Sequence, residues 1–311
     1  MGDNVTKKIP LLVVAGPTAS GKTTLAIRLA QQLGGEVVSA DSMQIYRGME
    51  IAAAKPTPEE LAAVPHHLVS IAEPDERFSV AQYAPLAHAA IREIHQRGRL
   101  PILCGGTGLY IQAVTEHLSY AEVEVDPQLR DDLQQCSSES LYEELKAIDP
   151  ETRLHMADRK RVIRALELYH ATGMTIAEQN VQSRAQPSPY ACRMIFLSVR
   201  ERQTLYGRID RRVDLMLAQG LLEEAAQWRQ SPAKTAAQAI GYKELEPYFL
   251  GTCTLDKAVA RLKQETRRYA KRQLSWFRRM AMEWNARAPG SCAELFVEDD
   301  VFAAAMEYLE K

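Results

Sequence analysis

The stretch VVAGPTASGKTTLA, from Val13 to Ala26, constrains the fold of this chain more than any other segment. Within it, residues 16–23 match the pattern G-x-x-x-x-G-K-[ST], with a β-branched run before them and helical spacing after them. In such a strand–loop–helix unit, backbone N–H groups and the helix N-terminus direct positive charge at a phosphate. We therefore expect a phosphate-binding loop, in which Lys22 supplies a full charge and the Thr23 hydroxyl reaches Mg²⁺.

Strand and helix patterns alternate along the first part of the chain. Apolar runs predict buried parallel strands at residues 9–16, 36–42, 99–108 and 192–199. Helical patterns lie between them, one of them from Pro85 to Arg97. This alternation predicts an α/β fold, a P-loop NTPase-like core with a parallel sheet flanked by helices.

A change of pattern indicates how the chain is divided. From residue 126 to residue 181 only charged helical patterns occur, and a strand pattern resumes after them. We therefore expect a core formed by residues 1–117 and 191–311, the second part ending in basic helices. Residues 118–190 are predicted to form a helical insertion domain.

Composition narrows the class of protein. The net charge is −2, so a nucleic-acid partner would have to be bound by local basic patches. Five cysteines without C-x-x-C or Cys/His spacing indicate reduced thiols, and the seven histidines offer no metal site. The apolar runs are too short to span a bilayer, and no secretory signal is visible. We expect a cytoplasmic monomer without membrane association.

The third predicted strand departs from the pattern of nucleotide hydrolases. Such enzymes often end this strand with an aspartate that helps to hold Mg²⁺, but here Cys104 and a Gly-Gly-Thr-Gly turn follow. Asp41 ends the second strand instead, at the edge where open α/β sheets bind ligands. Asp41 could be a helix N-cap, a general base or a partner of Mg²⁺. Thr107 is expected to point into the same pocket.

Seven motifs occur in a fixed order, GPTASGKT, SADSMQIYRGMEI, AKP, PHHLVSI, GGTGLY, RALELYHATG and TRRYAKRQLSWFR. Together they resemble the tRNA dimethylallyltransferase family from about Leu11 to Trp284. The resemblance implies transfer of a dimethylallyl group from dimethylallyl diphosphate to N6 of the adenosine beside the anticodon of certain tRNAs. It also implies Mg²⁺ and a tRNA held between the core and the insertion. Ala52 and Ala53 replace the usual Gly-Thr, so no binding role is carried onto them.

The resemblance assigns roles to residues around the phosphate loop. Lys22, Thr23 with Mg²⁺ and the loop N–H groups would neutralise the departing diphosphate. Asp41 resembles the base that takes a proton from N6, after the adenosine has flipped out of the anticodon loop. Arg212 corresponds to an arginine that reaches the diphosphate, and Thr107 completes the predicted catalytic set. The predicted diphosphate-binding residues are Gly16, Pro17, Thr18, Ala19, Ser20, Gly21, Lys22 and Thr23.

Two neighbours of Arg212 have a simpler interpretation. Arg208 and Arg211 could belong to an exposed helix, with Asp210 and Asp214 as their ionic partners. For Arg211 we prefer this interpretation.

Two basic segments predict contact with tRNA. Residues 261–279 carry eight Lys/Arg and one acid. On a helix they form a basic stripe, Arg261, Arg268, Arg272 and Arg279, and an apolar stripe expected to be core, Leu262, Tyr269, Trp276 and Met280. Such a one-signed stripe in a slightly acidic protein favours phosphate contact, and residues 159–167 match the family's tRNA-contacting segment. The predicted tRNA-binding residues are Asp41, Ser42, Met43, Gln44, Thr107, Arg130, Lys160, Arg161, Val162, Ile163, Arg164, Arg268 and Arg272.

Other functions remain open at this point. Tyr46 could stack on a base or simply pack. A P-loop kinase of small molecules would bind ATP and a hydroxyl acceptor, and prenyl transfer to free adenine nucleotides would keep the chemistry without tRNA. Neither explains the two basic helices. An RNA-binding module without activity would not explain Asp41 beside a complete phosphate loop.

Overall fold

The computed structural model describes residues 8–119, 126–184, 186–229 and 239–311. The chain forms two compact units. The first comprises Met1–Thr115 and Pro189–Lys311, and the second comprises Glu116–Ser188. No helix in the described ranges is both long enough and apolar enough to cross a membrane.

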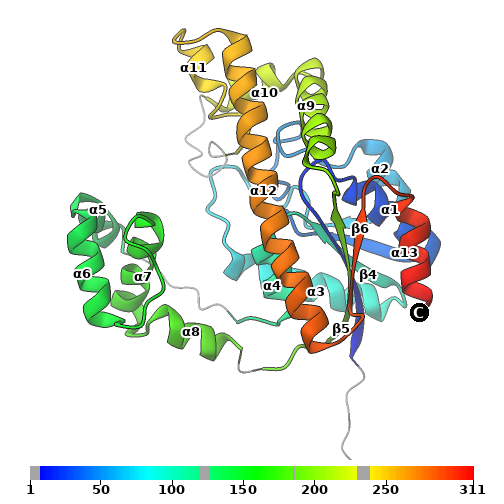
Figure 1. Ribbon diagram of the computed structural model, residues 1–311, viewed down its shortest axis with the longest axis horizontal. Helices are drawn as coiled ribbons and strands as arrows, with labels where there is room; N and C mark the ends of the chain where they lie inside the picture. Colours follow the sequence, from blue (N-terminus) through cyan, green and yellow to red (C-terminus); the bar gives the residue numbers. More distant parts are fainter. Residues whose placement is uncertain (1–7, 120–125, 185, 230–238) are drawn as a thin grey trace, which may run out of the picture. The chain divides into compact units, whose positions relative to one another are not determined.

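A six-stranded parallel sheet forms the centre of the first unit (Figure 1). Its strand order is β3-β2-β4-β1-β5-β6. The strands are β1 (Ile9–Ala15), β2 (Gly35–Ser39), β3 (His66–His67), β4 (Leu100–Gly105), β5 (Tyr190–Ser198) and β6 (Cys292–Phe296). The four predicted strands are confirmed, whereas β3 and β6 were not predicted. Two residues give no pattern for β3, and β6 is buried only at Cys292, so it lacks the continuous apolar run of the other strands.

Helices cover both faces of the sheet. They are α1 (Lys22–Leu33), α2 (Pro58–Ala63), α3 (Val80–Gln96), α4 (Gly108–Thr115), α9 (Arg202–Ala218), α10 (Leu221–Trp228), α11 (Glu246–Phe249), α12 (Leu255–Arg287) and α13 (Val301–Glu310). Helix α3 begins five residues before the predicted start at Pro85. Ser79 and Gln82 form a capping box there, and it stabilises the earlier start.

The strands are buried on both sides, which explains their continuous apolar sequences. In β1, Leu12 and Val14 pack with α1 and α13, while Leu11 and Val13 pack with α3, α4, α9 and α12. In Figure 1 the long helix α12 runs along one face of the sheet, and α1 and α13 cover the other. The loops that follow β1 and β4 at their carboxyl ends therefore lie within reach of α12, and the turn after β2 lies beside them.

The second unit is helical in its described part. It contains α5 (Pro127–Gln135), α6 (Ser138–Ile148), α7 (Arg159–Thr172) and α8 (Ile176–Ser183). Its own apolar core includes Leu133, Leu141, Leu145, Val162 and Leu166.

Candidate active site

The phosphate loop joins β1 to α1 with two residues in left-handed conformation. These are Ala19, with φ 62°, and Gly21, with φ 89° at the N-cap of α1. Arg208 from α9 holds the outside of the loop, because its Nε donates to the carbonyl of Ala19 at 2.8 Å and its Nη2 donates to that of Ser20 at 3.4 Å. The interpretation that Arg208 pairs with a neighbouring aspartate is therefore wrong.

Asp210 and Asp214, considered above as partners of Arg208 and Arg211, form ion pairs with residues of α12 instead. Arg267 lies 2.6 Å from Asp210, and Lys263 lies 2.6 Å from Asp214. Arg211 is exposed. The packing of α9 along α12 explains these pairings, which local spacing on α9 could not reveal.

A cavity of about 310 Å³ lies between the phosphate loop, α9 and α12. Its polar lining residues include Thr18, Lys22, Thr23, Asp41, Ser42, Gln44, Arg212, Lys243, Tyr269, Arg272 and Gln273. Its apolar lining residues include Met43, Ala52, Ala53, Val213, Met216, Leu221, Ile240 and Leu262. The structure thus brings Asp41, Lys22, Thr23 and Arg212, far apart in sequence, to one cavity whose lining is both charged and apolar.

Lys22 and Arg212 are the two buried cations of this cavity, and Asp41 is the carboxylate that acts on both. Burial lowers the pKa of Lys22, an effect that Asp41 opposes and Arg212 strengthens. Burial also lowers the pKa of Arg212, again opposed by Asp41. In the described ranges, no side-chain hydrogen bond or ion pair involves Arg212, and Lys22 donates only to the carbonyl of Pro17, at 3.3 Å. The arrangement favours an anion.

Asp41 lies in a turn that follows β2. Its Oδ1 accepts from the N–H of Met43 at 2.9 Å, and no α-helix starts there, so it is no helix N-cap. Thr107 supports this turn from the end of β4, because its Oγ1 accepts from the N–H of Ser42 at 3.0 Å and its own N–H donates to the carbonyl of Ala40 at 3.1 Å. Among described residues, none donates to Oδ2 of Asp41, which leaves that oxygen available to a ligand.

Gln273 on α12 connects the phosphate loop to the glycine-rich turn, and the sequence interpretation missed it. The side chain is 5% exposed; its Oε1 accepts from the N–H of Thr18 and its Nε2 donates to the carbonyl of Gly106, both at 2.9 Å. A signal was present, because Gln273 lies between Thr266 and Phe277 on the buried stripe of α12. A polar residue at such a position usually has specific partners.

The basic stripe of α12 lines a second cavity, an open groove of about 470 Å³ formed by Arg268, Lys271, Arg272, Ser275, Trp276 and Arg279. Arg279 lies 5.1 Å from the ring centre of Trp276, and Arg268 pairs with Glu265 at 2.6 Å. Of the apolar stripe, Leu262 and Met280 are buried, as predicted. Tyr269 and Trp276 are only half-buried, because their rings reach the two cavities.

The predicted tRNA-binding residues of the second unit lie around α7. Lys160, Arg161 and Arg164 are exposed, and Ile163 is half-buried. Val162 is 1% exposed and packs in the core of the unit.

Arg130 has a structural partner in that unit. It forms a double hydrogen bond with the buried carboxylate of Glu167, which also pairs with Arg164 at 3.4 Å.

One further sequence alternative concerned Tyr46, which could stack on a base or pack. Tyr46 is 1% exposed and belongs to the core, which confirms packing as its role. His67 bonds to Glu36 at 2.7 Å, and His66 to the carbonyl of Val64 at 2.9 Å. The described residues contain no cluster of His, Cys, Asp and Glu that could hold a metal ion.

The chain matches known families over most of its length. The IPP transferase family model matches residues 44–280, and the isopentenyl transferase model matches residues 9–71. A tRNA dimethylallyltransferase of Geobacillus thermodenitrificans is 49% identical over 289 residues, which cover 90% of each chain. One from Anoxybacillus flavithermus is 47% identical over 279 residues, which cover 88% of this chain and 89% of the relative.

Solved structures share the fold. The crystal structure of a tRNA isopentenylpyrophosphate transferase from Bacillus halodurans is 40% identical, with a TM-score of 0.69 and 97% of both chains covered. A eukaryotic dimethylallyltransferase acting on tRNA is 29% identical, with a TM-score of 0.79, covering 94% of this chain and 75% of that one.

Proposed function

Since the chain belongs to the tRNA dimethylallyltransferase family, we propose that its transfer of a dimethylallyl group to tRNA takes place in the 310 Å³ cavity beside the phosphate loop. The observation that carries this proposal is that two buried cations, Lys22 and Arg212, line one cavity together with several apolar side chains. A diphosphate ester with a short hydrocarbon group has the same two-sided chemistry.

The phosphate loop binds the diphosphate in this proposal. Lys22, Arg212 and the N-terminus of α1 oppose its negative charge, which grows as the bond to carbon breaks. The Thr23 hydroxyl lines the cavity beside Asp41, and these are oxygen donors of the kind that Mg²⁺ prefers. When bound, Mg²⁺ supplies further charge neutralisation at the diphosphate oxygens.

Asp41 acts as the general base. The N6 nitrogen of adenosine forms a bond to C1 of the dimethylallyl group, the bond from C1 to the diphosphate oxygen breaks, and the N6 proton passes to Oδ2 of Asp41. Thr107 and the N–H of Met43 hold the turn, so the carboxylate keeps its direction without a nearby side chain donor on Oδ2. Asp41→Asn should therefore remove turnover while tRNA affinity stays within about threefold of wild type.

The basic groove on α12 and the exposed cations of α7 are proposed to contact tRNA phosphates. Arg268, Lys271, Arg272 and Arg279 share one face of α12, and Trp276 offers a ring for stacking beside them. Val162, buried in the core of its unit, is not proposed to contact tRNA through its side chain. The remaining members of the tRNA-binding and diphosphate-binding sets are proposed to have the roles expected from the sequence.

One assay tests this function against its alternatives. Dimethylallyl diphosphate labelled in the hydrocarbon is incubated with the protein, Mg²⁺ and unmodified tRNA, and parallel reactions contain AMP or ATP. Label in tRNA supports the proposal. Label in AMP alone indicates a free-nucleotide prenyltransferase, and phosphate transfer from ATP without prenyl transfer indicates a kinase; either result contradicts it.

A further inference from the structure

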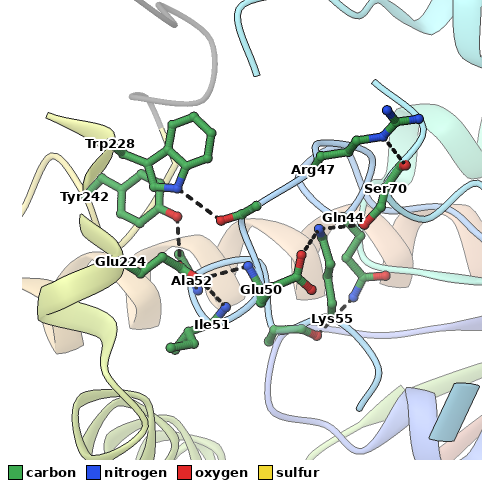
Figure 2. Close-up of polar contacts among 12 residues, drawn as sticks. Gln44, Arg47, Glu50, Ile51, Ala52, Lys55, Ser70, Glu224, Trp228 and Tyr242 are labelled. Atoms are coloured by element: carbon green, nitrogen blue, oxygen red, sulfur yellow. Dashed lines mark hydrogen bonds and ion pairs between the residues drawn. The ribbon is translucent and has the colours of Figure 1, made fainter. Parts of the chain in front are cut away.

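The loop at residues 48–55 forms one wall of the reaction cavity, through residues 52–54. It consists of turns, so its backbone groups need partners from other parts of the chain. The N–H groups of Glu50, Ile51 and Ala52 converge on a single carboxylate (Figure 2).

That carboxylate belongs to Glu224 on α10. Its Oε2 accepts from the N–H of Glu50 at 2.9 Å and of Ile51 at 2.8 Å, and its Oε1 accepts from the N–H of Ala52 and the hydroxyl of Tyr242, both at 2.8 Å. Glu224 is 9% exposed, and no described lysine or arginine pairs with it. Four neutral donors therefore stabilise this buried charge, and the three that are loop N–H groups do so only while the loop keeps its present conformation.

Helix α10 also holds the start of the loop, through a hydrogen bond from Trp228. Trp228 Nε1 donates to the carbonyl of Gly48 at 3.1 Å, and the Trp228 ring stacks on Tyr242 with centres 6.4 Å apart (Figure 2). Gly48 has φ 72°, and a Cβ there would lie 3.0 Å from the indole. Both the start and the middle of the loop are thus held from α10 and its neighbourhood.

The end of the loop is hydrogen-bonded to Gln44, a polar residue of the cavity lining. The carbonyl of Ala54 accepts from Nε2 of Gln44 at 3.1 Å, and Oε1 of Gln44 accepts from the hydroxyl of Ser39 at 2.9 Å. Gln44 lines the cavity with Asp41. The apolar wall and the Gln44 amide therefore depend on the same loop conformation.

The elements around Glu224 also line the cavity. Val213 and Met216 come from α9, and Leu221 comes from the first turn of α10. A Cβ on Gly241 would lie 3.5 Å from Cβ of Ala52 and 3.8 Å from Cδ1 of Leu221, so the loop and the start of α10 meet there. Because Glu224 lies one turn after Leu221, its four hydrogen bonds, here called the clasp, hold the loop against the start of α10.

We propose that Glu224 is a positioning residue, which holds residues 50–54 in the conformation that forms part of the apolar lining of the cavity and so restricts the transferred group to five carbons. The proposal rests on the function proposed above. Glu224 does not line the cavity itself; it acts through residues 50–54.

Glu224→Gln tests the proposal, because the amide turns an NH₂ group against backbone N–H donors and opens one side of the clasp. Glu223→Gln is the matched control, a neighbour on the same helix that is exposed. Transfer from dimethylallyl and from geranyl diphosphate is measured with saturating unmodified tRNA. The specificity ratio is kcat/KM for dimethylallyl diphosphate divided by kcat/KM for geranyl diphosphate. In E224Q this ratio should fall at least about tenfold, while affinity for inorganic diphosphate stays within about twofold. E223Q should keep the wild-type ratio.

The outcomes separate this proposal from the function on which it rests. If the wild-type protein transfers no label to tRNA, the function fails; if it does, and E224Q keeps the wild-type ratio, only the role of Glu224 is refuted. Tyr242→Phe serves where E224Q does not fold, since it removes one donor and keeps the ring stack. It should lower the ratio about threefold, and an unchanged ratio in a folded Y242F refutes the clasp.

Discussion

Replacing Gln273 with leucine should loosen the phosphate loop and destabilise the sheet-containing unit. The substitution keeps a side chain of similar length but removes both hydrogen bonds, at 2.9 Å to the N–H of Thr18 and at 2.9 Å to the carbonyl of Gly106. The Gly106 carbonyl bond is buried, so its loss costs about 1–3 kcal/mol. Thr18 borders the cavity, where water can replace the lost acceptor, so that end costs about 1 kcal/mol.

These terms add to about 2–4 kcal/mol of unfolding free energy. For a unit of this size, that corresponds to a fall in Tm of roughly 4–16 °C. Calorimetry of Q273L and Q264L measures it, with Gln264 as the control because it is exposed on the same helix. Affinity for inorganic diphosphate, measured by titration calorimetry, should also fall several-fold in Q273L only.

Two results would refute this reasoning. A Tm of Q273L within about 2 °C of that of Q264L would show that the two hydrogen bonds contribute nothing net. Unchanged affinity for diphosphate, despite a lower Tm, would show that Gln273 stabilises the fold without ordering the loop.

Three other predictions concern the loop, the groove and the helical unit. Arg208→Met should weaken inorganic diphosphate binding about fivefold, equivalent to about 1 kcal/mol, because the Ala19 and Ser20 carbonyls lose their donor; Arg211→Met should not, by the same titration. Replacing Arg268 and Arg272 with glutamine should reduce the slope of log K for tRNA against log salt by about 1.4–1.8, and an unchanged slope removes α12 from the interface. Burial raises the pKa of Glu167, but hydrogen bonds from the adjoining arginines outweigh it and hold that pKa below the usual 4.5. The stability that these hydrogen bonds contribute is present above pH 4.5 and is lost as the pH falls through the lowered pKa of Glu167. Amide hydrogen exchange in α7 should therefore rise over that pH range in the wild-type protein, and this rise should be absent from Glu167→Gln.

Much of the core could be predicted from the sequence, because its strands are buried on both faces. Such strands are continuous apolar runs, as in residues 9–15 and 190–198, and each one ends near a turn or a helix cap. The strand at His66–His67 could not be predicted, since two polar residues carry no periodicity. It exists because its N–H and carbonyl groups complete the edge beside Val37 and Val38.

The site divides in the same way. Lys22 and Thr23 belong to a loop motif, and Asp41 is an acid directly after a strand. Each can therefore be identified from its neighbours in the sequence. Gln273 and Glu224 cannot, because their backbone partners lie more than 150 residues away and only tertiary packing brings them together. What the sequence does contain is a polar residue on the buried stripe of a helix, and that pattern predicts a partner without identifying it.

Gly105, the last residue of β4, and Gly106 after it stand where nucleotide hydrolases often have a strand-end aspartate. A Cβ on Gly105 would lie 2.1 Å from the carbonyl oxygen of Ala40, and one on Gly106 would lie 2.4 Å from Nε2 of Gln273. A carboxylate side chain therefore cannot stand at Gly105 unless the backbone of Ala40 moves away. At Gly106 it would displace the Gln273 amide that bonds to the phosphate loop. The carboxylate that lines the cavity with Lys22 and Thr23 is Asp41, in the turn that follows the neighbouring strand β2.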